Sequence, residues 1–292
     1  MDSFAGFSGR LQRRPVRCAV PGLLLAVGLL AGCSAASGPG QEQASPAETG
    51  TAGPAVAAAA VQQEFVNVIR RVLPSVVEIR TSAGLGSGVV LDADGDIVTN
   101  AHVVEGEAGF QVLIASSAGP GSVPGSADAA AAPLPAVLVG SCPADDLAVI
   151  RVGDAARLHP ATFGDPASIA VGDIVLAIGS PLGLGGSVTE GIVSAVGRSV
   201  TEPASTGAPA AVLTDVIQTS AAINPGNSGG ALVSLDGEVI GIPTLAAVNR
   251  GAGGAAPGIG FAIPASTAVR VAGELAATGG AGSRAVPAGC HR

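Results

Sequence analysis

The stretch Asn224-Pro225-Gly226-Asn227-Ser228-Gly229-Gly230-Ala231-Leu232 is the most informative part of the sequence. It sets a serine among glycines, so the chain can turn tightly and other backbone can approach the serine closely. In such a turn, neighbouring amide N–H groups can point at one spot. Acyl transfer needs both features, because attack by a serine generates an oxyanion that fixed donors must stabilise. The stretch therefore predicts a nucleophilic serine at Ser228.

A base that activates this serine has to come from one of three histidines. His159 precedes a proline in a linker-like stretch, and His291 is the penultimate residue. His102 follows the apolar run Ile97-Val98-Thr99 through a short turn that can aim an imidazole. We therefore predict that His102 is the base.

An acid that orients the imidazole is offered just before the apolar run 147–150. Asp146 directly precedes this run, and Asp145 is its competitor. The order along the chain is then histidine, aspartate and serine. This is the order found in chymotrypsin-type proteases.

Four segments resemble the HtrA/Deg serine proteases, and they occur in the order that this family has. The segments are Thr99–Val104, Asp146–Ile150, Asn224–Leu232 and Gly258–Pro264. The resemblance favours Asp146 over Asp145 as the orienting acid. It implies that Ser228 is the nucleophile, that His102 is general base and then acid, and that Asp146 fixes the imidazole tautomer.

The same resemblance implies an oxyanion hole and a pocket for the substrate residue before the cut. The backbone N–H groups of Gly226 and Ser228 would form the hole, with Asn227 as a third candidate. The expected pocket residues carry no charge, and they are Ala222, Asn224, Thr244, Leu245 and Gly260. We therefore predict cleavage of polypeptide substrates after small or medium aliphatic residues. No cofactor and no metal are expected.

The spacing of apolar residues predicts a short helix near each end of an otherwise β-rich chain. Val61–Leu73 has helical spacing, and Pro74 would end that helix. A closing helix is predicted from Pro264 to about Ala277. Its apolar face would consist of Val269, Ala272 and Leu275.

Between these helices the sequence predicts short strands. They are expected at 76–81, 88–91, 97–99, 111–114, 136–139, 147–151, 173–179, 186–198, 212–219, 231–235, 239–245 and 260–263. Strands and helices do not alternate, which argues against a doubly wound sheet. The expected fold is all-β, with two antiparallel six-stranded barrels as in chymotrypsin. The protease domain would span 61–277, with lobes at about 61–160 and 165–277 and the site in the groove between them.

The amino-terminal residues 1–32 have the features of a bacterial secretory signal, because arginines precede an apolar run. The run ends in Leu30-Ala31-Gly32-Cys33, which resembles the lipobox of lipoproteins, so Cys33 is the candidate lipidated residue. An ordinary signal peptide is the alternative. Residues 33–60 are mostly small and polar, which predicts a disordered tether. The protein would then be exported and lipid-anchored through Cys33 to the outer face of the cytoplasmic membrane.

Composition narrows the partners further. All 14 basic residues are Arg, the net charge is −8, and no basic cluster occurs in the expected mature chain, which argues against nucleic-acid binding. Cys142 and Cys290 would lie in an oxidising compartment. They can form one disulfide or remain two free thiols, and the sequence leaves both open.

The tail at 278–292 is too short for the PDZ module that HtrA proteases commonly carry there. The family also implies a homotrimer with aromatic contacts near the amino terminus, where Phe65 is the aromatic residue available. Gly226–Gly230 also fits the serine motif of α/β-hydrolases, but that fold needs a histidine after the serine and His291 alone follows. A catalytically silent chaperone or binding protein with the protease fold stays open.

Overall fold

The computed structural model describes residues 54–82, 84–107, 109–114, 132–180, 186–202, 211–224, 226–249, 254–278 and 290. The expected signal, Cys33, most of the expected tether and the tail other than Thr278 and Cys290 lie outside these residues. Among the helices described, none combines the length and apolar character needed to cross a membrane.

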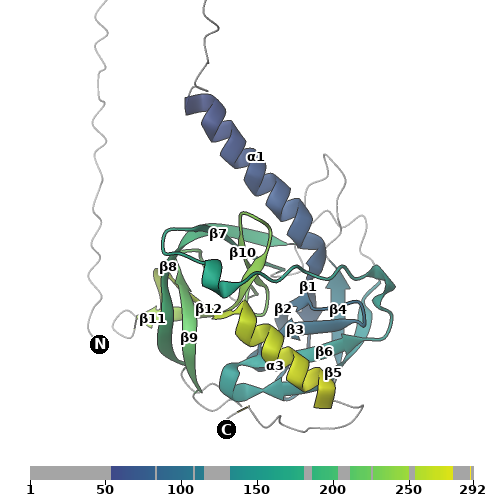
Figure 1. The fold of residues 1–292 in the computed structure, drawn as a ribbon. Helices are drawn as coiled ribbons and strands as arrows, with labels where there is room; N and C mark the ends of the chain where they lie inside the picture. The colour runs from purple at the N-terminus through teal and green to yellow at the C-terminus, as the bar shows by residue number, and fades with distance from the viewer. Residues whose placement is uncertain are drawn as a thin grey trace, which may run out of the picture. The chain divides into compact units, whose positions relative to one another are not determined.

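The first barrel consists of six short antiparallel strands, as the apolar runs predicted. They are β1 (Val76–Arg80), β2 (Leu85–Val90), β3 (Asp96–Thr99), β4 (Phe110–Ile114), β5 (Leu134–Cys142) and β6 (Leu147–Val152). Hydrogen bonds join them in the order β1-β2-β3-β6-β5-β4 and back to β1 (Figure 1). Val and Ile dominate these runs, and their branched side chains suit a pleated, buried surface.

The second barrel repeats this architecture with longer strands. They are β7 (Ile174–Gly179), β8 (Ser187–Glu202), β9 (Ala211–Thr219), β10 (Ala231–Ser234), β11 (Val239–Asn249) and β12 (Gly254–Pro264). Their order is β10-β11-β12-β9-β8-β7, and β7 pairs with β10 to close the sheet. The prediction of two six-stranded antiparallel barrels is confirmed.

The hairpin between β2 and β3 shows how local side chains set the register. Asp92 Oδ1 accepts the backbone N–H groups of Asp94 at 2.9 Å and Asp96 at 3.2 Å. Gly95 provides the left-handed step of the turn, with φ of 92°. Asp96 then faces Arg151 on β6 and accepts two hydrogen bonds of 2.6 Å from its guanidinium.

The amino-terminal helix α1 spans Pro54–Val72 and continues as a short 3₁₀ turn at Leu73–Ser75. It starts earlier than the predicted Val61, so residues 54–60 are helical, although we expected them in the tether. An alanine-rich run after a proline explains the difference, since alanine is the best helix former and proline suits the first turn. Val68 and Val72 are buried, and Phe65 packs against the same core.

The closing helix α3 spans Ala265–Thr278. Its buried face consists of Ala268, Val271, Ala272 and Leu275, whereas Val269 is 40% exposed. The predicted face is therefore confirmed for Ala272 and Leu275 and was wrong for Val269, since the neighbouring Ala268 is buried in its place. Leu275 packs so closely on Gly140 of β5 that a Cβ there would meet Leu275 Cδ2 at 2.8 Å. The helix thus packs against the first barrel.

Candidate active site

His102 is presented by the one-turn helix α2 (Ala101–Val104), which follows β3. Ala101 and Val104 are buried and anchor this turn, while the His102 side chain stays 28% exposed. Strand β3 pairs with β6, and Thr99 lies opposite Ala148. The end of β3 therefore lies beside the start of β6, where the predicted acid lies.

Asp146 directly precedes β6 in the left-handed conformation, with φ of 49° and ψ of 43°. Aspartate tolerates this conformation better than most residues do. The Asp146 N–H donates to the Pro143 carbonyl at 3.3 Å, and Asn100 Nδ2 donates to the Asp146 carbonyl at 2.9 Å. These bonds hold both ends of the residue and so fix the direction of its buried carboxylate.

The Asp146 carboxylate contacts His102 at two points. Oδ1 accepts the His102 backbone N–H at 3.1 Å, and the ring Nδ1 lies 3.0 Å from both carboxylate oxygens. An ionised carboxylate can only accept, so Nδ1 carries the proton and Nε2 is left as the basic nitrogen. Asp145, the competitor, turns its carboxylate towards Cys142 instead.

Thr244 on β11 connects the acid of the first barrel with the serine of the second. Its hydroxyl donates to Asp146 Oδ2 at 2.5 Å. Its backbone carbonyl accepts the Ser228 hydroxyl at 3.2 Å. A continuous path of contacts therefore joins His102, Asp146, Thr244 and Ser228.

The backbone around Ser228 forms the predicted tight turn. Gly226 has φ of 102° and Gly229 has φ of 80°, values that glycine adopts without strain. The Asn227 N–H donates to the Asn224 carbonyl at 3.0 Å, so it is engaged within the turn. Within the described residues, the N–H groups of Gly226 and Ser228 have no acceptor.

The predicted pocket residues lie in different surroundings. Ala222 and Asn224 are exposed, Gly260 is buried, and the side chain of Leu245 lies outside the described part. Thr244 is buried, and its side chain faces Asp146. The sequence predicted Thr244 as a residue of the substrate pocket. In the structure, the Thr244 hydroxyl donates to the Asp146 carboxylate.

A family model, the trypsin-like peptidase domain, matches residues 86–242, more than half of the chain. Serine protease PepD of Mycobacterium tuberculosis is 42% identical over 238 residues, which are 78% of this chain and 50% of PepD. The HtrA-type protease AlgW, solved with a tripeptide, matches with a TM-score of 0.59 and 38% identity, over 73% of this chain and 63% of AlgW. This chain belongs to the HtrA family of trypsin-like serine proteases.

A further HtrA relative is a probable periplasmic serine endoprotease, DegP-like, from Halomonas elongata. It is 44% identical over 191 residues, covering 65% of this chain and 35% of the relative. The chain thus spans half or less of the length of these two curated relatives.

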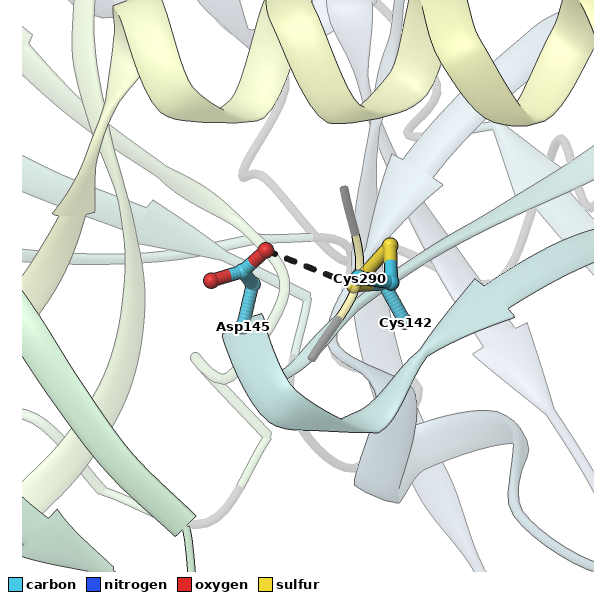
Figure 2. A group of neighbouring side chains, drawn as sticks. All are labelled: Cys142, Asp145 and Cys290. Atoms are coloured by element: carbon cyan, nitrogen blue, oxygen red, sulfur yellow. Dashed lines mark hydrogen bonds between the residues drawn. A yellow bond between two sulfur atoms is a disulfide. The ribbon is translucent and has the colours of Figure 1, made fainter. Parts of the chain in front are cut away.

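One disulfide joins β5 to the carboxyl-terminal tail of this HtrA chain. Cys142, at the end of β5, is bonded to Cys290, and Figure 2 shows Asp145 beside the pair. The Asp145 Oδ2 lies 3.3 Å from the Cys142 Sγ. These three residues form the group of candidate metal ligands found in the described part of the chain. Because the disulfide leaves neither sulfur as a thiolate, we assign no metal to this group.

Sequence reasoning missed two buried polar residues that shape the HtrA site. Asn100 holds the Asp146 backbone, and Ser87 on β2 donates its N–H to the Ser228 carbonyl at 3.0 Å. Both are fully buried. The available signal was a polar residue within or directly after an apolar strand, since buried polar groups need partners.

Proposed function

We propose that this HtrA-family chain is a serine endopeptidase that cleaves polypeptides through an acyl-enzyme at Ser228. The observation that carries this proposal is the path of contacts from His102 through Asp146 and Thr244 to Ser228. It connects a basic imidazole nitrogen, a buried carboxylate and a serine hydroxyl that come from two different barrels. These are the groups that nucleophilic acyl transfer requires.

The reaction begins when the Ser228 hydroxyl leaves the Thr244 carbonyl and gives its proton to Nε2 of His102. The serine oxygen attacks the substrate carbonyl, and His102 passes the proton to the leaving amine. A water molecule then repeats both steps on the acyl-enzyme and releases the new carboxyl end. Asp146 stays ionised and stabilises the imidazolium.

The oxyanion of each tetrahedral intermediate is held by the backbone N–H groups of Gly226 and Ser228. The engagement of the Asn227 N–H within its turn supports this choice, because it leaves the two flanking amides as the donors. Losing one such donor typically lowers turnover by ~10²–10³.

The substrate residue before the cut is small or medium and aliphatic. The uncharged character of Ala222, Asn224 and Gly260 supports this preference. A peptide library profiled for that position tests it, and a preference for Arg or Lys contradicts it.

The substrates are exported or misfolded proteins of the cell envelope. The periplasmic relatives support an exported chain. Lipid attachment at Cys33 is tested by labelling cells with a fatty-acid analogue, where Cys33→Ser should lose the label. A homotrimer is tested by light scattering of the purified chain. Phe65 packs against the barrel core, so any trimer contact through it needs the exposed part of its ring.

The main experiment is casein digestion by the full chain beside Ser228→Ala. The wild type should release peptides and react with a fluorophosphonate, and Ser228→Ala should do neither. Ser234→Ala is a matched control, since it removes a buried hydroxyl with no partner among the described residues. Equal digestion by Ser228→Ala contradicts the proposal, and binding of casein without digestion by the wild type favours a silent chaperone.

A further inference from the structure

Ser87 makes three hydrogen bonds to Ser228 and its surroundings through its N–H and its hydroxyl. Its N–H donates to the Ser228 carbonyl at 3.0 Å, and its hydroxyl donates to the Gly226 carbonyl at 2.5 Å. The same hydroxyl oxygen accepts the Ser180 N–H at 2.8 Å. Ser87 lies on β2 of the first barrel, whereas its three partners belong to the second. The residue is therefore a polar link between the barrels at the nucleophile turn.

The two carbonyls that Ser87 binds flank the amide of the nucleophile. A peptide unit is planar, so the Gly226 carbonyl and the Asn227 N–H point in opposite directions from one rigid plane. The Asn227 N–H donates to the Asn224 carbonyl, so this plane is held at both ends. The plane that follows Ser228 is held in the same way, because the Gly229 N–H donates to a carbonyl on β11 at 3.0 Å.

The Ser228 N–H belongs to the plane between these two. Its carbonyl end, on Asn227, accepts the Gly230 N–H at 2.9 Å. With all three planes held, the direction of the Ser228 N–H is determined before substrate arrives. Preorganisation of this kind gives oxyanion donors their catalytic effect, since no reorientation is needed during the reaction.

Glycine makes such external support necessary. Gly226 adopts a positive φ, and a residue without a Cβ can rotate its flanking peptides at little steric cost. We propose that Ser87 is a positioning residue of the oxyanion hole, whose hydroxyl holds the Gly226 carbonyl and thereby helps to keep the Ser228 N–H in the catalytic orientation. This inference rests on the proposed endopeptidase function and adds a residue from the opposite barrel to it.

The hydroxyl is suited to this role because it donates and accepts at once. Ser87 is fully buried, so replacing it by alanine leaves the Gly226 carbonyl and the Ser180 N–H without their partner. A buried polar group without a partner is unfavourable, and the Gly226 peptide can relieve this by rotating. That rotation would displace Asn227 and turn the Ser228 N–H, which follows it along the chain, away from the oxyanion.

The test is a kinetic comparison of the wild type, Ser87→Ala and the matched Ser234→Ala on one peptide substrate. We expect Ser87→Ala to lower kcat by about 10- to 100-fold, less than the loss of a whole donor. Its KM should stay within about threefold, and its affinity for a peptide aldehyde should fall in parallel with kcat/KM, because the aldehyde adduct carries the oxyanion. The pH–rate profile should keep its midpoint, since His102 and Asp146 are untouched.

Each outcome separates the two proposals. If the wild type is active, Ser228→Ala is inactive and Ser87→Ala equals the wild type, the positioning role is overturned and the endopeptidase function stands. If the wild type cuts nothing, both fail. If Ser87→Ala does not fold, a crystal structure of the wild type with the peptide aldehyde bound tests the positioning role instead. A Gly226 carbonyl turned away from Ser87 in an occupied hole overturns the role, and a retained contact supports it.

Discussion

The hydroxyl of Thr244 on the second barrel donates a 2.5 Å hydrogen bond to Asp146 on the first. The same residue accepts the Ser228 hydroxyl with its backbone carbonyl. Thr244 therefore touches both the acid and the nucleophile, and its side chain and backbone contribute separately. Substitution of the side chain tests the first contact and leaves the second in place.

Thr244→Val should lower kcat by about 10-fold or more. A hydrogen bond to a charged group contributes about 1.5–3 kcal/mol, and 1.36 kcal/mol corresponds to a factor of ten in rate. Steady-state kinetics measure the change. Thr219→Val is the control, because it removes a buried hydroxyl that donates to the Ile192 carbonyl at 2.9 Å in the second barrel. An equal loss in both variants would show a general packing effect.

Asp146→Asn should lower kcat by roughly 10³–10⁴, because an amide beside Nδ1 no longer fixes the productive tautomer. Asp145→Asn is its matched control, with the same substitution one residue away. Its carboxylate faces the disulfide, so kcat should change by less than about threefold. Casein digestion and fluorophosphonate labelling follow both variants. A larger loss in Asp145→Asn than in Asp146→Asn would instead show that Asp145 orients the imidazole, and would contradict the assignment to Asp146.

Gly229→Ala should prevent the nucleophile turn from forming. A Cβ at this position would lie 2.2 Å from the Ser87 carbonyl oxygen and 2.3 Å from Thr99 Oγ1, in a backbone with positive φ. Gly273→Ala, on α3 with open space around its Cβ, should instead raise stability by about 0.5–1 kcal/mol. Thermal unfolding and activity assays distinguish the two. An active, normally stable Gly229→Ala enzyme would contradict the geometry of the turn.

Reduction of the Cys142–Cys290 disulfide should destabilise the chain. The two cysteines are 148 positions apart, and a cross-link over a long loop typically contributes about 2–4 kcal/mol by restricting the unfolded chain. Thermal unfolding with and without a thiol reductant measures the difference. A Cys142→Ser, Cys290→Ser double variant should show the lower unfolding temperature in both buffers. An unfolding temperature insensitive to reductant in the wild type would argue for two free thiols.

The strands and the candidate catalytic residues could be predicted because their signals are local. Runs of Val and Ile specify strands wherever they pack, and a histidine, an aspartate and a serine with family-like neighbours identify themselves. The contacts that complete the site are not local. Thr244 reaches Asp146 across 98 positions, and Ser87 reaches Gly226 across 139. Such pairs depend on how two barrels pack, which no single segment encodes.

The errors in the helices have a similar origin. The face that α3 buries is decided by its contact with Gly140 and its neighbours on β5, so Val269 could be assigned to the wrong side from periodicity alone. The early start of α1 reflects helix propensity in residues that looked too small to fold. Helix propensity alone is a weak predictor of helix formation. Here the helix is anchored at its end by the buried Val68 and Val72, and the alanine-rich residues before it extend it.

Asp96→Asn should destabilise the first barrel, because it removes the carboxylate that pairs with Arg151. We expect a loss of about 1–2 kcal/mol, less than for a fully buried ion pair, because the Arg151 side chain is 40% exposed and solvent screens the pair. The hydrogen bonds that Arg151 donates to the Asp96 carboxylate raise the pKa of Arg151 above its usual value. A basic group whose pKa is higher in the folded than in the unfolded state stabilises the fold. This stabilisation is fully present below the pKa of the unfolded state and is lost as the pH rises through the pKa of the folded state. Both values lie far above neutrality, so the difference in unfolding free energy between wild type and variant should stay constant from about pH 7 to 10. Urea unfolding at these pH values measures it, and a difference that vanishes by pH 10 would contradict a persistent ion pair.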